Sequence, residues 1–177
     1  NVKIAECVAA VKDGADEIDI VLAHNSFCDG RYEDCAKEIS DIKAAIAGVN
    51  PAVHLKVILE TGALPGYDAI ATASFLAMEA GADFIKTSTG KTGVSATPEA
   101  AYVMCECIRA FCALTGRKVG FKPAGGLSSA EDASLYYGIV DTVLGSEWLN
   151  PGLLRFGASR MANNLLCALE GKEVKYF

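Results

Sequence analysis

This chain of 177 residues contains few of the residues from which metal, redox and dinucleotide sites are usually built. It has only two histidines, His24 and His54, too few for a metal centre made of clustered imidazoles. No C-x-x-C pair occurs, and no G-x-G-x-x-G follows a strand-like segment. We therefore expect no bound metal and no other cofactor.

Basic charge and long apolar runs are also lacking. The net charge of −6 argues against a nucleic-acid partner and leaves no basic face for a membrane surface. No apolar run approaches the roughly 20 residues of a transmembrane helix. The composition is nevertheless 51% hydrophobic, which excludes disorder and supports one domain over residues 1–177. We expect its partner to be a small molecule.

The seven cysteines form no recognisable framework. Their number is odd, and most lie in helix-like segments, where Cys behaves as a small hydrophobe. This favours reduced core thiols over a redox or metal role, and with them a reducing, cytoplasmic location. The chain also lacks an initiating Met, and residues 1–6 resemble a helix interior rather than a signal peptide. We expect a fragment or a trimmed product.

Helix-like and strand-like segments alternate along the chain. Strands are expected at 16–23, 53–59, 83–87, 119–123, 142–145 and 154–157, and helices at 2–13, 32–47, 67–80, 97–115, 128–137 and 160–169. Thr97 is a good N-cap, with Pro98 at the first helical position. Ser128 and Glu131 have the spacing of a capping box. Such alternation predicts βαβ units on a parallel sheet.

A weak internal repeat favours a barrel over an open sheet. Residues 13–18 resemble residues 80–85, each being a helix end, a Gly and the start of a strand. A TIM (β/α)8 barrel has eight strands and typically about 250 residues, whereas we expect about six βα units here. Because the chain starts in a helix, we place the two missing units at its amino end. A six-stranded doubly wound sheet is the alternative.

Period-two alternation places several charged side chains inside this barrel. In each strand the apolar set should face the helices and the opposite set the lumen. The inward set then includes four charged residues from four different strands, Asp19, Lys56, Lys86 and Lys122. One inward charge would usually be a structural ion pair, but four converging charges favour a functional site.

Three lysines and one aspartate suggest imine chemistry. A net positive pocket favours an anionic substrate and lowers the pKa of the most buried lysine. A neutral lysine can form a Schiff base with an aldehyde or ketone, and the protonated imine then accepts electrons from a breaking C–C bond. Asp19 is placed to move protons, directly or through a water molecule.

Three glycine-containing turns follow predicted strands, at residues 88–91, 124–126 and 157–159. Each leads toward a helix N-terminus, where exposed N–H groups bind phosphate. The alternative is that the glycines only make tight turns. Three such turns on one barrel face, together with Lys91, favour a phosphate site.

The motifs resemble those of the deoxyribose-phosphate aldolase family, whose members are class I aldolases with a TIM-barrel fold. The resemblance covers essentially the whole chain. It is carried by residues 15–19 (ADEID), 55–62 (LKVILETG), 81–91 (GADFIKTSTGK), 119–126 (VGFKPAGG) and 155–159 (RFGAS). The third and fourth motifs are the most specific, because they are long, polar and rigidly spaced.

The resemblance implies reversible cleavage of 2-deoxy-D-ribose 5-phosphate into D-glyceraldehyde 3-phosphate and acetaldehyde. Lys86 is similar to the Schiff-base lysine, and Lys122 to a second lysine whose charge favours the neutral amine of the first. Asp19 is similar to the acid/base aspartate, and Lys56 to a lysine that supports the proton relay. The positions that match the phosphate site are Gly90, Lys91, Gly125, Gly126, Gly157 and Ser159.

Two positions depart from the family pattern. Arg160 stands where members commonly have a second Ser, and Tyr176 is penultimate, whereas some members send a C-terminal Tyr into the active site. Two other functions stay open. One is another Schiff-base barrel, such as a transaldolase-like or keto-acid aldolase; the other is a truncated sugar-phosphate-binding chain without turnover. A homo-oligomer is compatible with the sequence, which does not fix the oligomeric state.

Overall fold

The computed structural model describes residues 2–173 and 175–176. Helices and strands alternate along it, as the sequence pattern predicts. In chain order they are α1 (Val2–Lys12), β1 (Glu17–Val21), α2 (His24–Cys28), α3 (Tyr32–Val49), β2 (His54–Ile58), the 3₁₀ turn η1 (Thr61–Ala63), α4 (Tyr67–Glu79), β3 (Phe84–Lys86), α5 (Pro98–Thr115), β4 (Gly120–Lys122), α6 (Ala130–Leu144), the 3₁₀ turn η2 (Ser146–Trp148) and α7 (Met161–Glu170). Only α2 had no counterpart among the expected helices.

The four strands form one parallel sheet in the order β1-β2-β3-β4, so each strand pairs with the next along the chain. Residues 154–157 run beside β4, through bridges between Phe121 and Leu154 and between Ala124 and Gly157. Sequential parallel pairing with helical crossovers is the topology of a TIM barrel. The architecture is therefore an arc of such a barrel, and the predicted fold class is confirmed.

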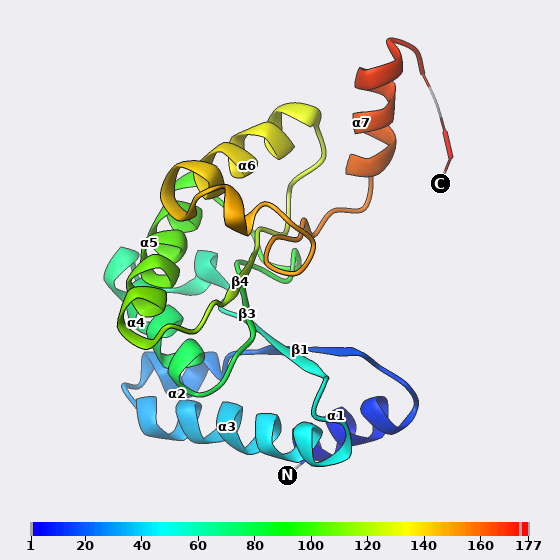
Figure 1. Ribbon diagram of the computed structural model, residues 1–177. Helices are drawn as coiled ribbons and strands as arrows, with labels where there is room; N and C mark the ends of the chain where they lie inside the picture. The colour runs from blue at the N-terminus through cyan, green and yellow to red at the C-terminus, as the bar shows by residue number, and fades with distance from the viewer. Residues whose placement is uncertain (1, 174, 177) are drawn as a thin grey trace.

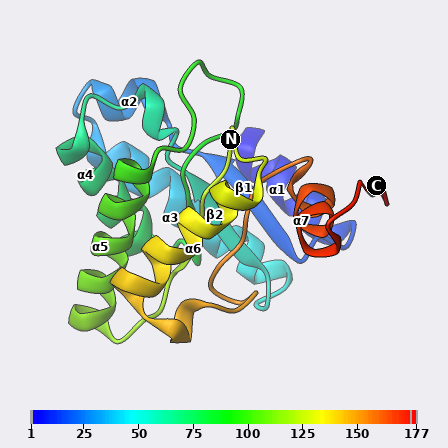
Figure 2. The ribbon, with the colours of Figure 1, turned by 90° about the horizontal axis from the view of Figure 1, so that it is seen from above.

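The helices lie on the outer side of this arc. In Figures 1 and 2, α3, α4, α5 and α6 follow one another around the sheet, while α7 stands apart near the carboxyl end. The side chains that the sequence pattern turned toward the helices are buried, among them Ile18, Leu55, Val57, Ile85 and Phe121. None of the described helices combines the length and apolarity that crossing a membrane requires.

The number of barrel units differs from the prediction. We expected six strands, but the described residues form four strands and one further strand position at 154–157. The expected strand at 142–145 is wrong: residues 142–144 form the last turn of α6. Their β-branched residues suggested a strand, but Tyr136, Val140 and Leu144 are buried at helical spacing and hold the segment in the helix.

The start of α6 also differs by one residue. The N-cap is Ser129 rather than Ser128, and its partner at the third helical position is Asp132 rather than Glu131. The Ser129 hydroxyl accepts the Asp132 N–H at 3.0 Å, and the Asp132 carboxylate accepts the Ser129 N–H at 2.9 Å. The Asp132 carboxylate also accepts the Ser128 N–H at 2.9 Å, so both serines contact the residue that closes the box. The predicted Thr97 cap of α5 is confirmed, since its hydroxyl accepts the Ala100 N–H.

The cysteines behave largely as core residues. No disulfide joins any of the cysteines in the described part of the chain, and Cys7, Cys35, Cys105 and Cys107 are buried. Burial raises the pKa of the Cys107 thiol to about 11, which keeps it protonated and unreactive at neutral pH.

Gly120 makes room for an aromatic ring beneath the polar cluster described below. A Cβ at this position would lie 2.2 Å from Cε1 of Phe84. We expect Gly120→Ala to lower the free energy of unfolding by about 1–3 kcal/mol through overpacking. Urea denaturation measures this change.

Gly138 provides the matched control. It lies exposed within α6, and a Cβ there would meet no atom within 4 Å. Gly138→Ala should raise stability by roughly 0.5–1 kcal/mol, because Ala favours the helix. Equal effects of the two substitutions would contradict the close packing of Phe84 against Gly120.

Candidate active site

The strand register brings the four predicted charged residues to one side of the sheet. Asp19 is level with Lys56, while Lys86 is level with Lys122 and lies two residues further along the strands. Side chains two residues apart on a strand share a face. The predicted convergence of four strands on one polar cluster is therefore found in the structure.

The Asp19 carboxylate lies at the centre of this cluster. Its Oδ2 accepts a hydrogen bond from Lys86 Nζ at 3.0 Å and lies 3.5 Å from Lys122 Nζ, while its Oδ1 lies 3.3 Å from Lys56 Nζ. The side chains of Lys86 and Lys122 are 14% and 20% exposed, so solvent and a small substrate can reach them. Lys56 is 2% exposed and lies beneath them.

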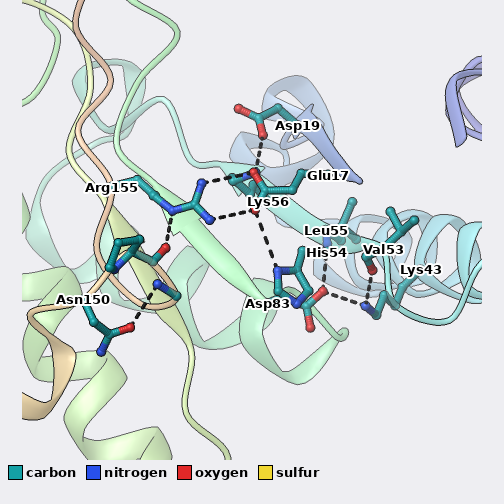
Figure 3. Close-up of polar contacts among 12 residues, drawn as sticks. Glu17, Asp19, Lys43, Val53, His54, Leu55, Lys56, Asp83, Asn150 and Arg155 are labelled. Atoms are coloured by element: carbon teal, nitrogen blue, oxygen red, sulfur yellow. Dashed lines mark hydrogen bonds and ion pairs between the residues drawn. The ribbon is translucent and has the colours of Figure 1, made fainter. Parts of the chain in front are cut away.

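A second group of charges lies on the amino-terminal side of Asp19 and was not assigned from the sequence. Figure 3 shows Glu17 between Lys56 and Arg155. Glu17 accepts a hydrogen bond from Lys56 Nζ at 2.5 Å and one from Arg155 Nη2 at 3.1 Å. The Arg155 guanidinium also stacks on the Phe84 ring, 5.6 Å from its centroid. The parity of Glu17 with Asp19 was visible in the sequence, but the distant Arg155 was not.

These contacts fix the charge states of both carboxylates. Burial by itself would raise the pKa of Asp19, but the hydrogen bond from Lys86 and the charges of Lys122, Lys86 and Lys56 outweigh it, so that the pKa falls below its ordinary value. Burial would likewise raise the pKa of Glu17, but the hydrogen bonds and charges of Lys56 and Arg155 outweigh it, so that this pKa also falls below its ordinary value. Both side chains are therefore anionic at neutral pH and compensate the surrounding cations.

Lys122 experiences the opposite balance. Burial lowers the pKa of its ammonium below the ordinary value, and the charges of Lys86 and Lys56 act in the same direction. Asp19 opposes this change but does not cancel it. The cluster thus contains an amine that gives up its proton more readily than a free lysine.

The three glycine turns predicted to bind phosphate lie side by side. A Cβ at Gly90 would lie 3.5 Å from Cα of Gly125, and the Gly125 N–H donates to the Gly157 carbonyl at 3.3 Å. A Cβ at Gly157 would come within 3.5 Å of Cε of Lys122. The row of turns therefore adjoins the lysine cluster.

The turns do not all offer free donors. The N–H of Gly125 is used by Gly157, and that of Gly157 by Pro123. Within the described part of the chain, the N–H groups of Gly90 and Gly126 donate to no protein group. Lys91 and Ser159 are exposed in the same loops, with Arg160 beside Ser159 at the start of α7.

The remaining candidates lie outside this arrangement. The Tyr176 hydroxyl lies 3.4 Å from a carboxylate oxygen of Glu170, so the side chain is directed toward α7. His24 Nε2 lies 2.8 Å from the Leu59 carbonyl. Among the described residues, no group of three or more His, Cys, Asp or Glu side chains is arranged to hold a metal ion.

Comparison with known proteins decides the family. Residues 1–136 match the model of the DeoC/LacD family aldolases. The chain belongs to this family. The deoxyribose-phosphate aldolase of Agrobacterium fabrum (strain C58 / ATCC 33970) is 46% identical over 170 residues, which are 96% of this chain and 63% of that protein. A Caenorhabditis elegans relative is 46% identical over 167 residues, 94% of this chain and 54% of the relative.

A solved family structure has the same arrangement of elements. The apo-form crystal structure of a Toxoplasma gondii ME49 protein matches with a TM-score of 0.82 and 26% identity, over 95% of this chain and 65% of that one. The chain thus spans between half and two thirds of the length of these relatives. This agrees with the sheet, in which the described residues supply five of the eight strand positions of a closed barrel. The two-unit deficit that we expected is too small.

The lowered pKa of Asp19 predicts how stability depends on pH. A carboxyl group with a depressed folded-state pKa stabilises the fold above its unfolded pKa of about 3.9, and this contribution is lost as the pH falls through the folded value. We expect the difference in free energy of unfolding between wild type and Asp19→Asn to become smaller as the pH is lowered from 6 to 3. Urea denaturation at each pH measures it.

Asp141→Asn serves as the control, because Asp141 is exposed on α6 and forms no ion pair within the described residues. The free energy of unfolding of this variant should stay close to that of wild type throughout the range from pH 6 to 3. A pH-independent difference for Asp19→Asn would show that its charge is not held by the three lysines.

Proposed function

We propose that this chain carries the imine-forming part of an aldolase that splits 2-deoxy-D-ribose 5-phosphate into D-glyceraldehyde 3-phosphate and acetaldehyde. One observation carries the proposal: Asp19 is within 3.5 Å of three amines from three different strands. The family of the chain and the name of the Agrobacterium relative support the reaction class and the substrate.

In this proposal Lys86 is the nucleophile. Its neutral amine adds to the C1 aldehyde of the open-chain sugar, and loss of water gives a protonated imine. Removal of the proton from the C3 hydroxyl then allows the C2–C3 bond to break, and its electron pair moves toward the imine to give an enamine. Protonation at C2 and hydrolysis release acetaldehyde and restore the amine.

Asp19 and Lys122 supply the proton transfers and the electrostatic setting. The anionic Asp19 is hydrogen-bonded to Lys86, where it can accept or return protons directly or through a water molecule. Lys122 disfavours a second positive charge close by, and burial lowers the pKa of its own ammonium below the ordinary value. Buried Lys56 holds Asp19 from below and is held in turn by Glu17.

The phosphate end of the substrate is assigned to the glycine turns. The free N–H groups of Gly90 and Gly126 and the ammonium of Lys91 are suitable donors for a phosphate, and Gly157 brings this site next to Lys122. Gly125 and Gly157 then act through close packing, because their own N–H groups are already used. Ser159 at the start of α7 completes the proposed site.

A second candidate is sugar-phosphate binding without turnover. It is favoured by the open arc, in which strand β1 pairs only with β2 among the described strands. A displacement of about 1 Å in a catalytic group can cost roughly a hundredfold in rate. We also propose that the whole protein forms a homo-oligomer and is located in the cytoplasm.

Borohydride trapping tests the proposed imine. Incubation with 2-deoxy-D-ribose 5-phosphate and borohydride should give a covalent adduct on the peptide that contains Lys86, as located by mass spectrometry. Lys86→Arg keeps the positive charge but cannot form the imine and should give no adduct. Asp19→Asn should slow trapping by about 10²–10⁴-fold, the usual contribution of acid/base catalysis.

The same measurement separates the alternatives. An adduct on Lys122, or none with any sugar, would contradict the assignment of Lys86. A better rate with a keto sugar or keto acid would indicate another Schiff-base aldolase. Trapping without release of acetaldehyde would favour the second candidate function, sugar-phosphate binding without turnover.

A further inference from the structure

Glu60 has an unusual backbone conformation for its residue type. It follows β2 and is 5% exposed. Among the described residues it is the one non-glycine residue with positive φ, at 52°. The left-handed region is unfavourable for a residue with a Cβ, so the surrounding contacts must hold it there.

Its carboxylate is fully engaged by the loop that follows β3. Both oxygens accept from the Thr89 N–H, at 3.2 and 3.3 Å, and Oε2 accepts from the Thr89 hydroxyl at 2.5 Å. The Thr92 hydroxyl lies 3.2 Å from Oε1. The Thr89 hydroxyl in turn accepts the Lys91 N–H at 3.1 Å, so the carboxylate also orients Lys91.

The two residues after Glu60 contact the same loop. The Thr61 N–H donates to the Thr87 carbonyl at 2.9 Å, and a Cβ at Gly62 would lie 2.2 Å from the Val94 carbonyl oxygen. On its other side the loop packs closely against the second glycine turn, because a Cβ at Gly125 would lie 2.6 Å from Cβ of Ser95. The position of the loop is thus set from both sides.

These contacts determine which donors the loop leaves for a ligand. Glu60 uses the N–H of Thr89 and, through the Thr89 hydroxyl, that of Lys91. The N–H of Gly90, between them, has no protein acceptor in the described part of the chain. The Lys91 ammonium likewise forms no ion pair with any described residue. The Gly90 N–H and the Lys91 ammonium are thus among the donors that the loop leaves unused, and they are the ones expected to meet a phosphate.

We propose that Glu60 is a positioning residue for the phosphate end of the substrate: its carboxylate fixes residues 88–95 so that Gly90 and Lys91 lie beside the Gly125–Gly126 turn. This inference rests on the proposed function. A carboxylate suits this role, because its Oε2 accepts from both the N–H and the hydroxyl of Thr89, while its Oε1 shares the Thr89 N–H and lies beside the Thr92 hydroxyl, which is also 2.8 Å from the Val94 carbonyl oxygen.

Glu60→Gln is the direct test, because it keeps the size of the side chain while it removes the negative charge and replaces one oxygen acceptor with an NH₂ donor. The rate of borohydride trapping is measured against the concentration of 2-deoxy-D-ribose 5-phosphate and, separately, of unphosphorylated 2-deoxy-D-ribose. We expect the half-saturating concentration of the phosphorylated sugar to rise by about tenfold or more, with the limiting rate changed less than about threefold. Trapping of the unphosphorylated sugar should stay within about twofold of wild type.

Two further variants keep the test decisive. Glu79→Gln, at the outer end of α4, is the matched control and should leave both sugars unaffected. Thr89→Val removes the hydroxyl link from the loop side while leaving Glu60 intact, and it should reproduce the selective loss. It replaces Glu60→Gln as the test if that variant does not fold.

The outcomes separate this inference from the proposed function. A wild-type chain that traps neither sugar on Lys86 contradicts the proposed function. Wild-type trapping that favours the phosphorylated sugar, together with a Glu60→Gln or Thr89→Val variant that keeps that preference, overturns the role of Glu60 alone. Equal losses for both sugars would also overturn it, since they would show general damage to the fold rather than misplacement of the phosphate donors.

Discussion

The site depends on one carboxylate that three ammonium groups share. Asp19 belongs to β1, and its partners Lys56, Lys86 and Lys122 belong to β2, β3 and β4. Three cations so close together and so little exposed would repel one another, and each loses hydration on folding. The anionic Asp19 makes their proximity tolerable without cancelling their charge. The pairing register of the four strands therefore also determines the electrostatic environment of the three amines.

A second carboxylate extends this arrangement across the arc. Glu17 in β1 contacts Arg155, which belongs to the strand position at the opposite end of the sheet. The sheet is open between these ends, yet it curves enough for the two side chains to meet. An ion pair across the concave side thus joins the first and last strand positions, with the Phe84 ring beneath the guanidinium and Gly120 leaving room for that ring.

The sequence predicted those parts of the site that depend on local periodicity. A charged residue within an apolar strand has a defined parity, so the inward orientation of Asp19, Lys56, Lys86 and Lys122 followed directly. Contacts between distant segments have no such local signal. Arg155 and Glu17 are 138 residues apart, and their pairing requires knowledge of the curvature of the sheet.

The segment 142–145 shows the opposite failure, since its local β-propensity was overridden by burial of one helical face of α6. Glu60 stayed unassigned for a third reason. Its role depends on a left-handed backbone and on a loop that begins 28 residues later, and neither leaves a periodic pattern. The chemistry-bearing side chains were thus predictable from their strands, whereas the residues that position the loops were not.

The two ends of the site are held in different ways, and this difference has a physical reason. The amines project from strands, whose pairing fixes them as rigidly as the sheet itself. The proposed phosphate donors lie on loops, which lack such pairing and must be fixed by side chains and close backbone contacts. Glycine at 62, 125 and 157 allows those contacts, and the Glu60 carboxylate supplies the hydrogen bonds that a strand neighbour would otherwise provide. A barrel that places reactive groups on strands and ligand donors on loops needs residues such as Glu60, which hold the loops at a fixed position relative to the strands.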